Sequence, residues 1–306
     1  MKKAALVIAC LAASWPAAAI AQNYPTRPIK MIVPISVGSI TDVASRLTAQ
    51  ELQERLGQSV IVINKPGAAM VLGGSECAKS DPDGYTLCVV SPDTMSFNPL
   101  TIPNLPYNPE KDFVPVIDMY HVIEGLMVPA ATGINSIEAL RAKAVAEPGK
   151  LNYGTLGEHW KTNFVAIPYK GGSEIIAALL GNTIDVTKIG VGNMTSQLKE
   201  GKIKVLALRA SHRSPQLPDV PTFTEAGFGA FPGGPIFWGA VVPAGTPAPI
   251  VKRLHDELFA IFRGPKFTDF ANQNFLDPAA ASTEDFAAFL KKDRQDAAVL
   301  VDKYMK

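Results

Sequence analysis

The sequence is poor in the residues that carry most enzymatic and metal chemistry. It has four histidines and three cysteines in 306 residues, and the histidines lie in unrelated contexts. It contains no G-x-S-x-G nucleophile motif, no G-x-x-x-x-G-K-[ST] phosphate loop and no G-x-G-x-x-G dinucleotide motif. These absences give no support to hydrolysis, nucleotide binding or a metal centre, so we expect neither an enzyme nor a cofactor.

Long apolar runs are also missing, apart from one at the N-terminus. Lys2 and Lys3 precede the apolar run Ala4–Ala13, and Ala19-Ile20-Ala21 forms an A-x-A cleavage pattern before Gln22. This is typical of a secretory signal peptide spanning residues 1–21, which predicts a periplasmic mature protein. Cleavage at a lipidated Cys10 is the alternative, but it leaves only nine residues upstream.

An excess of charge of either sign is absent. Removing the signal peptide leaves 27 basic and 28 acidic residues, which argues against a nucleic-acid partner. The two cysteines of the mature chain, Cys77 and Cys88, are predicted on a helix and on the following strand. An oxidising compartment would permit a disulfide between them, although two separate buried apolar side chains are the preferred interpretation.

Strand and helix patterns alternate along two stretches of the chain. Strands are expected at Ile29–Val33, Val60–Ile63 and Tyr85–Val90, separated by helices, which predicts a parallel sheet. The first of these helices is expected to bury its larger apolar residues and to stop at Gly57; those residues are Val43, Leu47, Leu52 and Leu56. The last helices are expected to bury Ile250, Leu254, Leu258, Ile261, Phe286, Phe289 and Leu290.

A second alternating series predicts a second α/β lobe. Its elements include a helix opening at Asn135 or Ser136 and strands at Leu151–Gly154, Phe164–Ile167, Ile184–Lys188 and Val205–Leu208. We place lobe 1 at residues 22–125 and 232–306 and lobe 2 at residues 126–231, with two chain crossings and a ligand cleft between the lobes.

The junction Ile29–Asp42 runs a strand into the start of a helix. Ser39 followed by Asp42 gives the S-x-x-D pattern of a helix N-cap. Backbone N–H groups at a helix start lack intrahelical partners and carry the positive end of the dipole, so a carboxylate or phosphate is stabilised there. The alternative is a strand-to-helix turn that binds nothing.

Motifs along nearly all of the mature chain resemble the periplasmic solute-binding proteins of tripartite tricarboxylate transporters, the TctC or Bug family. The matching stretches occur in the family's order and include YPTRPIKMIVP (24–34), GSITDVASR (38–46), LGQSVIVINKPGA (56–68), SDPDGYTL (80–87), LPYNPEKDFVPV (105–116), IPYKGG (167–172) and SPQLPDVPTFTEAG (214–227). The resemblance implies a two-lobe type II periplasmic-binding-protein fold. It also implies a monomer that captures a small organic acid for membrane transporter subunits.

The resemblance implies a site made of loop backbone and hydroxyl groups rather than arginine, in agreement with a first loop that has no Lys or Arg from Val33 to Ser45. Carried over position by position, the expected ligand-binding residues are Ile35, Ser36, Gly38, Ser39, Thr41, Ser91, Thr155 and Gly157. Relatives usually have an aromatic residue at Ile35 and a glycine at Ser39. After Gly157 the chain is about a dozen residues shorter than the family pattern, which is about one helix.

The sequence leaves the orientation of Asp42, the ligand class and the cellular role undecided. Asp42 is expected to turn back toward the helix cap. If it faced the ligand instead, it would favour an amino or amide group over an acid. Di- and tricarboxylates, amino acids and aromatic acids or amides are all compatible with the sequence. The alternatives to a transport receptor are a ligand-binding partner of a sensor protein and a truncated paralogue with impaired binding.

Overall fold

The computed structural model describes residues 24–147, 167, 172–227 and 234–304, and these form two units. Unit 1 contains the described residues up to Tyr120, Phe237–Thr268 and the described residues from Pro278 onward. Unit 2 contains the described residues within His121–Ile236 and Asp269–Asp277. None of the helices in this described part of the chain is long and apolar enough to cross a membrane.

Unit 1 is built on a sheet with the strand order β2-β1-β3-β8-β4-β9. Its strands are β1 (Ile29–Val33), β2 (Val60–Asn64), β3 (Thr86–Val90), β4 (Phe113–Val122), β8 (Ile236–Pro243) and β9 (Leu276–Pro278). The first strand pairs in parallel with β2 and β3, as the alternating pattern predicts, while β3 pairs antiparallel with β8. All five residues of β3 are buried, because the strand lies inside the sheet.

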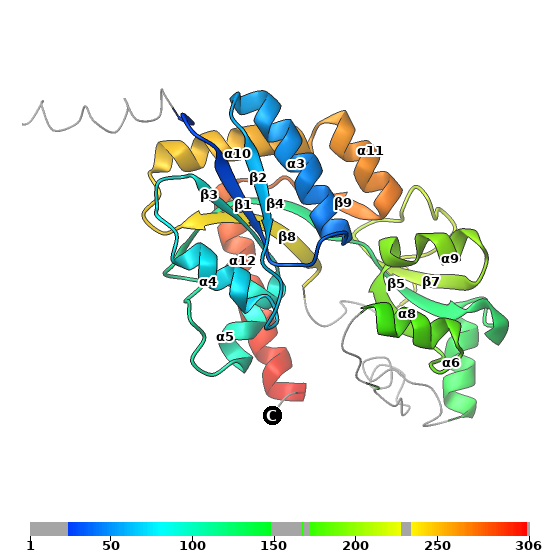
Figure 1. Cartoon of the computed structure of the whole chain (residues 1–306). Coiled ribbons are helices and arrows are strands. Elements are labelled where there is room, and N and C mark those ends of the chain that lie inside the picture. The colour runs from blue at the N-terminus through cyan, green and yellow to red at the C-terminus, as the bar shows by residue number, and fades with distance from the viewer. Residues whose placement is uncertain (1–23, 148–166, 168–171, 228–233, 305–306) are drawn as a thin grey trace, which may run out of the picture. The chain divides into compact units, whose positions relative to one another are not determined.

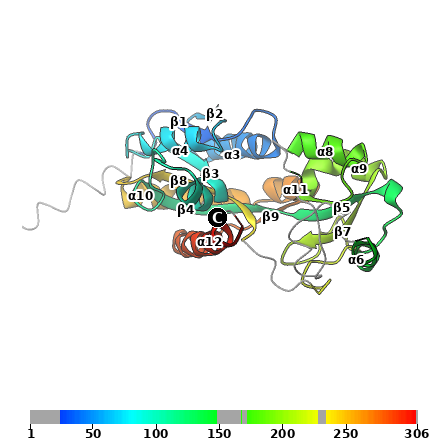
Figure 2. The same ribbon diagram turned by 90° about the horizontal axis from the view of Figure 1, so that it is seen from below.

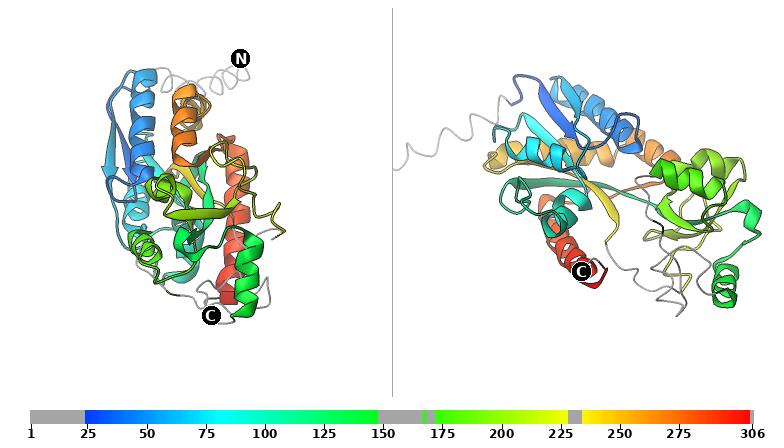
Figure 3. Two further views of the ribbon diagram at one scale, coloured as in Figure 1. Left: turned by 90° about the vertical axis from the view of Figure 1, so that its right-hand side faces the viewer. Right: turned by 60° about the horizontal axis from the view of Figure 1, so that its bottom comes forward.

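The helices of unit 1 are α3 (Ile40–Leu56), α4 (Val71–Ala78), α5 (Asn98–Thr101), α10 (Ala248–Phe262) and α12 (Thr283–Tyr304), together with a π-helical segment η1 (Asp93–Phe97). Helix α3 packs beside α10, as Figure 1 shows, and α12 packs on η1 and α5 (Figure 3). The predicted core residues of the last two helices are confirmed, since all seven are buried or half-buried.

The predicted core face of α3 is only partly correct: Leu52 is buried and Leu47 and Leu56 are half-buried, but Val43 is not. Val43 is 43% exposed, while the buried face consists mainly of small residues such as Ala44, Thr48 and Ala49. Small side chains let the helix approach its neighbours closely, and the buried hydroxyl of Thr48 donates to the carbonyl of Ala44 at 2.8 Å. The predicted end of the helix is correct: Gly57 adopts φ 67° as the C-cap.

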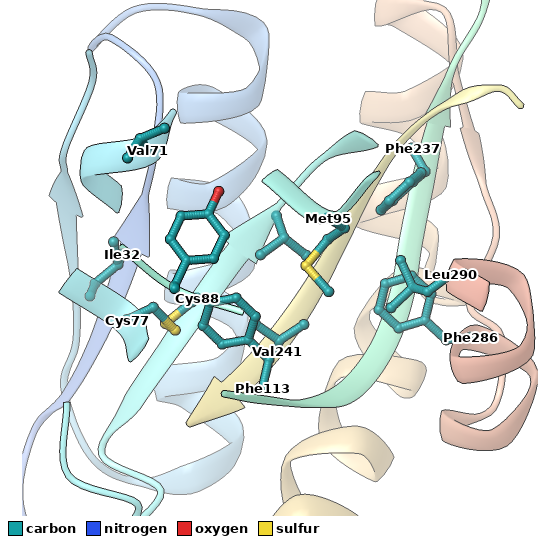
Figure 4. Packing of buried hydrophobic residues seen from close by; sticks show 12 residues of the cluster. Ile32, Val71, Cys77, Cys88, Met95, Phe113, Phe237, Val241, Phe286 and Leu290 are labelled. Atoms are coloured by element: carbon teal, nitrogen blue, oxygen red, sulfur yellow. A yellow bond between two sulfur atoms is a disulfide. The ribbon is translucent and has the colours of Figure 1, made fainter. Parts of the chain in front are cut away.

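The core of unit 1 surrounds a disulfide between Cys77 on α4 and Cys88 on β3 (Figure 4). The preferred interpretation of two unlinked apolar cysteines is therefore wrong, although both side chains are buried. Helix α4 packs directly on β3, which brings the two sulfurs together. On the other side of the same cluster, the ring of Phe286 fills the space that the missing side chain of Gly239 leaves on β8.

Unit 2 has a sheet with the strand order β6-β5-β7, in which β5 (Glu124–Pro129) runs antiparallel to β6 (Thr187–Gly190) and to β7 (Ile203–Arg209). One face carries α6 (Ile137–Ala146). The other carries α8 (Gly172–Leu180) and α9 (Thr195–Lys199), as Figure 2 shows. Ser136 is the N-cap of α6, one of the two predicted starts. The strand expected at Leu151–Gly154 lies outside the described residues, as does nearly all of the one expected at Phe164–Ile167.

The segment Asp269–Asp277 belongs to unit 2, whereas the sequence analysis places it in lobe 1. It contains the end of helix α11 (Pro265–Asn274) and the start of β9, neither of which the sequence analysis predicts. The side chain of Phe275 packs in the same apolar cluster as Ile123, and the N–H of Ile123 donates to the carbonyl of Phe275 at 3.0 Å. The chain therefore passes between the units four times rather than twice.

Candidate functional site

Three loops lie at one edge of the unit 1 sheet. Because β1, β2 and β3 are parallel, the loops that follow them begin at the same edge, at Pro34, Lys65 and Ser91. The first two loops are closely packed: a Cβ added at Gly73, in the first turn of α4, would lie 2.7 Å from the Cβ of Pro34. We call this arrangement the loop edge of unit 1.

The first loop ends in a capped helix start, as the sequence predicts. The hydroxyl of Ser39 accepts the N–H of Asp42 at 3.2 Å, and the carbonyl of Ser39 accepts the N–H of Val43 at 3.0 Å. Within the described residues, the N–H groups of Ile40 and Thr41 donate to no protein acceptor. They form the positive end of a 17-residue helix, where an anion is stabilised.

Asp42 turns back into the protein, as the sequence analysis expects. Its carboxylate accepts the N–H of Gly38 at 2.9 Å, the amide of Asn64 at 2.9 Å and the guanidinium of Arg46 at 3.1 Å. The residue is only 2% exposed. Burial acts to raise the pKa of Asp42, but the hydrogen bonds from Arg46, Gly38 and Asn64 outweigh it and hold the pKa below its ordinary value. An acid at the helix start therefore does not meet this carboxylate directly.

Asn64 and Arg46 hold the first loop in place, and the sequence analysis did not select either residue. The Asn64 amide also donates to the carbonyl of Ile35 at 3.0 Å, while its own oxygen accepts Arg46 at 3.0 Å. Asn64 thus connects the end of β2 directly to Ile35 and, through the carboxylate of Asp42, to Gly38 at the other end of the loop. The sequence signal that could have indicated Asn64 is a polar residue at the end of an apolar strand.

The third loop contributes a buried hydroxyl. Ser91 is 1% exposed, and its hydroxyl donates to the sulfur of Met70 at 3.1 Å. This contact joins the loop after β3 to the loop after β2. The Ser91 hydroxyl is therefore engaged within the protein rather than directed at solvent.

The second loop has a strained backbone that the sequence analysis did not detect. Ala68, Ala69 and Met70 have φ angles of 48°, 51° and 70°, in the left-handed region that L-residues disfavour. Each such residue costs on the order of 1 kcal/mol or more, and such strain persists only where the surroundings impose it. Here the carbonyl of Ala69 accepts the Asn98 amide at 2.8 Å.

The predicted site residues of unit 1 all lie at the loop edge, but they are not equally accessible. Ser36 and Gly38 are exposed, and Ile35 and Ser39 are half-buried. Thr41 is 2% exposed, and its hydroxyl faces the buried Tyr120, so its side chain is not directed at a ligand. Thr155, Gly157 and the shortened segment up to residue 166 lie outside the described residues.

Unit 2 contains a buried charged cluster, in which Glu124 lies between Lys188 and Arg209. Lys188 is hydrogen-bonded to one carboxylate oxygen of Glu124, and Arg209 contacts the other at 2.9 Å. Burial lowers the pKa of Lys188, and the charge of Glu124 offsets part of that effect. A pocket of about 280 Å³ adjoins Arg209. An acid there would meet a cluster in which the charge of Glu124 offsets one of the two positive charges of Lys188 and Arg209.

The described residues offer no other strong chemical centre. Among them, no three His, Cys, Asp or Glu side chains come together as a metal site requires. His255 contacts Asp256 at 3.3 Å on the surface of α10, where Asp256 also pairs with Lys252 at 2.6 Å. Lys252 and Asp256 are solvated, whereas the His255 ring is largely covered and its Nε2 is buried.

Comparison with known proteins gives a consistent result. The model of the tripartite tricarboxylate transporter family receptor, TctC, matches residues 44–304. A protein from the gbd 5' region of Cupriavidus necator is 31% identical over 95% of this chain and 91% of its own length. The protein BugT of Bordetella pertussis is 32% identical over 90% of this chain and 88% of its own length.

Solved structures with the same two-lobe fold include several solute-binding proteins. The periplasmic binding protein BugD is 31% identical, with a TM-score of 0.77 over 92% of this chain and 98% of that chain. An R. palustris protein solved with adipate is 26% identical, with a TM-score of 0.80 over 91% of this chain and 97% of that chain. MatC from Rhodopseudomonas palustris with bound malate is 26% identical, with a TM-score of 0.75 over 91% and 100%.

Proposed function

Since the chain belongs to the tripartite tricarboxylate transporter receptor family, a family of substrate-binding receptors rather than enzymes, we propose that it captures a small organic acid in the periplasm for a transporter of this type. The acid is held at the loop edge of unit 1. Two solved relatives are complexes with carboxylates, adipate in one and malate in the other.

One observation carries this proposal: the open N–H groups at the start of α3 together with the inward turn of Asp42. The helix start offers hydrogen bonds and a positive dipole end to a carboxylate, and the carboxylate that would repel it is buried and fully hydrogen-bonded. Ser36 and Gly38 flank this position as exposed residues, which lets a ligand approach the backbone. The residues proposed to contact the acid are Ile35, Ser36, Gly38, Ser39 and Thr41, with Ser91 supporting them from the third loop.

The rest of the proposal concerns the second lobe and the cellular setting. Thr155 and Gly157 are proposed as contacts from the second lobe. The chain is proposed to act as a monomer after cleavage between Ala21 and Gln22, and the Cys77–Cys88 disulfide suits an oxidising compartment. The intact mass of the protein recovered from the periplasm tests the cleavage site, and a lipidated form beginning at Cys10 would contradict it.

The test of binding is a thermal-shift screen of small acids on the mature protein, followed by calorimetry. A ligand at 100 times its dissociation constant adds about 2.7 kcal/mol of stability. The variant Ser39→Glu places a carboxylate at the helix start, where it suits the dipole but repels the ligand. We therefore expect affinity to fall at least about tenfold while the fold is retained.

Ser136→Glu is the matched control, because Ser136 is also an N-cap serine whose hydroxyl accepts a backbone N–H, at the start of α6 in unit 2. It should leave affinity unchanged. Equal affinities in wild type and in Ser39→Glu would show that the acid binds elsewhere.

A further inference from the structure

Large apolar side chains are exposed at the loop edge of unit 1. Val37, in the loop after β1, is 70% exposed, and Leu72, in the first turn of α4, is 53% exposed. Val43, in the first turn of α3, is 43% exposed. Single exposed apolar residues are ordinary, but these three come from the loops and helix starts at one edge. Val37 and Val43 are close to Ile40 and Thr41 in the chain, and Leu72 directly precedes Gly73, which packs against Pro34 of the first loop.

The second loop extends this apolar surface. The methyl groups of Ala68 and Ala69 are exposed, and Met70 is half-buried. Leu72 lies over Gly67, since its Cδ1 is 3.0 Å from where a Gly67 Cβ would stand. The Ser91 hydroxyl is directed at the Met70 sulfur, so the third loop presents no free hydroxyl from this residue.

The basic side chains at the same edge, Arg46 and Lys65, are already paired. Arg46 is bonded to Asp42 and Asn64, and Lys65 pairs with Glu76 at 3.7 Å. In the described part of unit 1, the two N–H groups of Ile40 and Thr41 are therefore the anion site of this edge, which suits one carboxylate. Asp42 is buried, whereas Asp93, at the start of η1 after the third loop, is an exposed carboxylate of the same edge.

We propose that the ligand is a carboxylic acid with an apolar body, of the aromatic or alkyl class, whose carboxylate binds the start of α3 and whose body lies against Val37 and Leu72. This inference rests on the proposed function and narrows its ligand class. A tricarboxylate would place its second or third carboxylate against Val37, Leu72 or Met70. The cost of removing that carboxylate from water would not be offset there by hydrogen bonds.

The experiment compares benzoate, malate and citrate by calorimetry on the mature protein. We expect benzoate to bind at least about tenfold more tightly than citrate or malate, because its ring buries apolar surface of the protein and the two polar acids do not. Val37→Ser should weaken benzoate binding by about tenfold. Val299→Ser is the control, because Val299 is 67% exposed on α12 of the same unit and should leave the affinity unchanged.

The outcomes separate this inference from the proposed function. If citrate or malate binds more tightly than benzoate, the apolar class is wrong while carboxylate binding stands. If benzoate binds but Val37→Ser and Val299→Ser behave alike, the apolar body does not lie at this edge and the inference fails. If none of the three acids binds, this inference fails, while the proposed function is decided by the screen of small acids. Circular dichroism of both variants verifies that the fold is retained.

Discussion

Removing the Cys77–Cys88 disulfide is expected to destabilise unit 1 by about 3 kcal/mol. The bridge closes a loop with a sequence separation of 11 residues. In the chain-entropy model, such a loop restricts the unfolded state by about 9 cal/mol/K, which is about 2.8 kcal/mol at 25 °C. For a domain of roughly 150 to 250 residues, this lowers the melting temperature by roughly 6 to 11 °C.

Both sulfurs are buried, so reduction requires unfolding in reductant and refolding with the reductant present. Scanning calorimetry then compares the oxidised and the reduced protein, and thiol titration after unfolding confirms the redox state. The paired variant Cys77→Ala with Cys88→Ala is the control, because its melting temperature should not respond to reductant. It should also melt below the reduced wild type, since it leaves cavities in the core next to Phe113.

The disulfide also links the two elements that carry the second and third loops of the loop edge. Cys88 lies on β3, three residues before Ser91, and Cys77 lies on α4, which begins directly after Met70. The reduced protein should therefore bind its acid more weakly, because the contact between Ser91 and Met70 is held less firmly. Equal melting temperatures for the oxidised and the reduced protein, with free thiols demonstrated, would refute this reasoning.

Two further predictions concern the backbone and the charge of the loop edge. Ala69→Gly should raise the free energy of unfolding by up to about 1 kcal/mol, because Ala69 has φ 51°, a conformation that glycine adopts without strain. Ala287→Gly, at an exposed position of α12, should instead lower the free energy of unfolding by about 0.5–1 kcal/mol. Urea denaturation measures both variants, and two effects of the same sign would contradict the strain at Ala69. Asp42 has a pKa held below its ordinary value of 3.8, so its contribution to stability is full above about pH 4 and is lost as the pH falls through the lowered value. The gap in melting temperature between wild type and Asp42→Asn should therefore shrink below about pH 4, and a gap that stays constant down to pH 2.5 would exclude this role.

The local signals in the sequence predicted the first lobe well. β1 spans the predicted residues, Ser39 caps the predicted helix, and Asp42 turns back as its position in the first turn requires. These features depend on contacts within a few residues of the chain, which pattern and capping rules describe directly.

The features that were missed depend on residues far apart in the sequence. Asn64 reaches Ile35 across 29 positions, and Phe275 packs beside Ile123 although it lies 152 positions later in the chain. The left-handed run from Ala68 to Met70 has no local signature, because Ala and Met disfavour that conformation, and the contacts of Ala69 and Met70 with Asn98 and Ser91 accompany it. The buried face of α3 was misjudged because close packing favoured Ala and Thr over Val43.

The departures from the family pattern that the sequence analysis expects at Ile35 and Ser39 should have a limited effect on anion binding for the same physical reason. The N–H groups of Ile40 and Thr41 and the dipole of α3 are properties of the backbone, so they stay in place whatever side chain precedes them. Ser39 in addition satisfies the N–H of Asp42, which a glycine at that position would leave without a cap. A change of side chain at this edge instead alters the protein surface that contacts the rest of the ligand. The choice among acids is therefore expected to lie with Val37, Met70 and Leu72 rather than with the group that binds the charge.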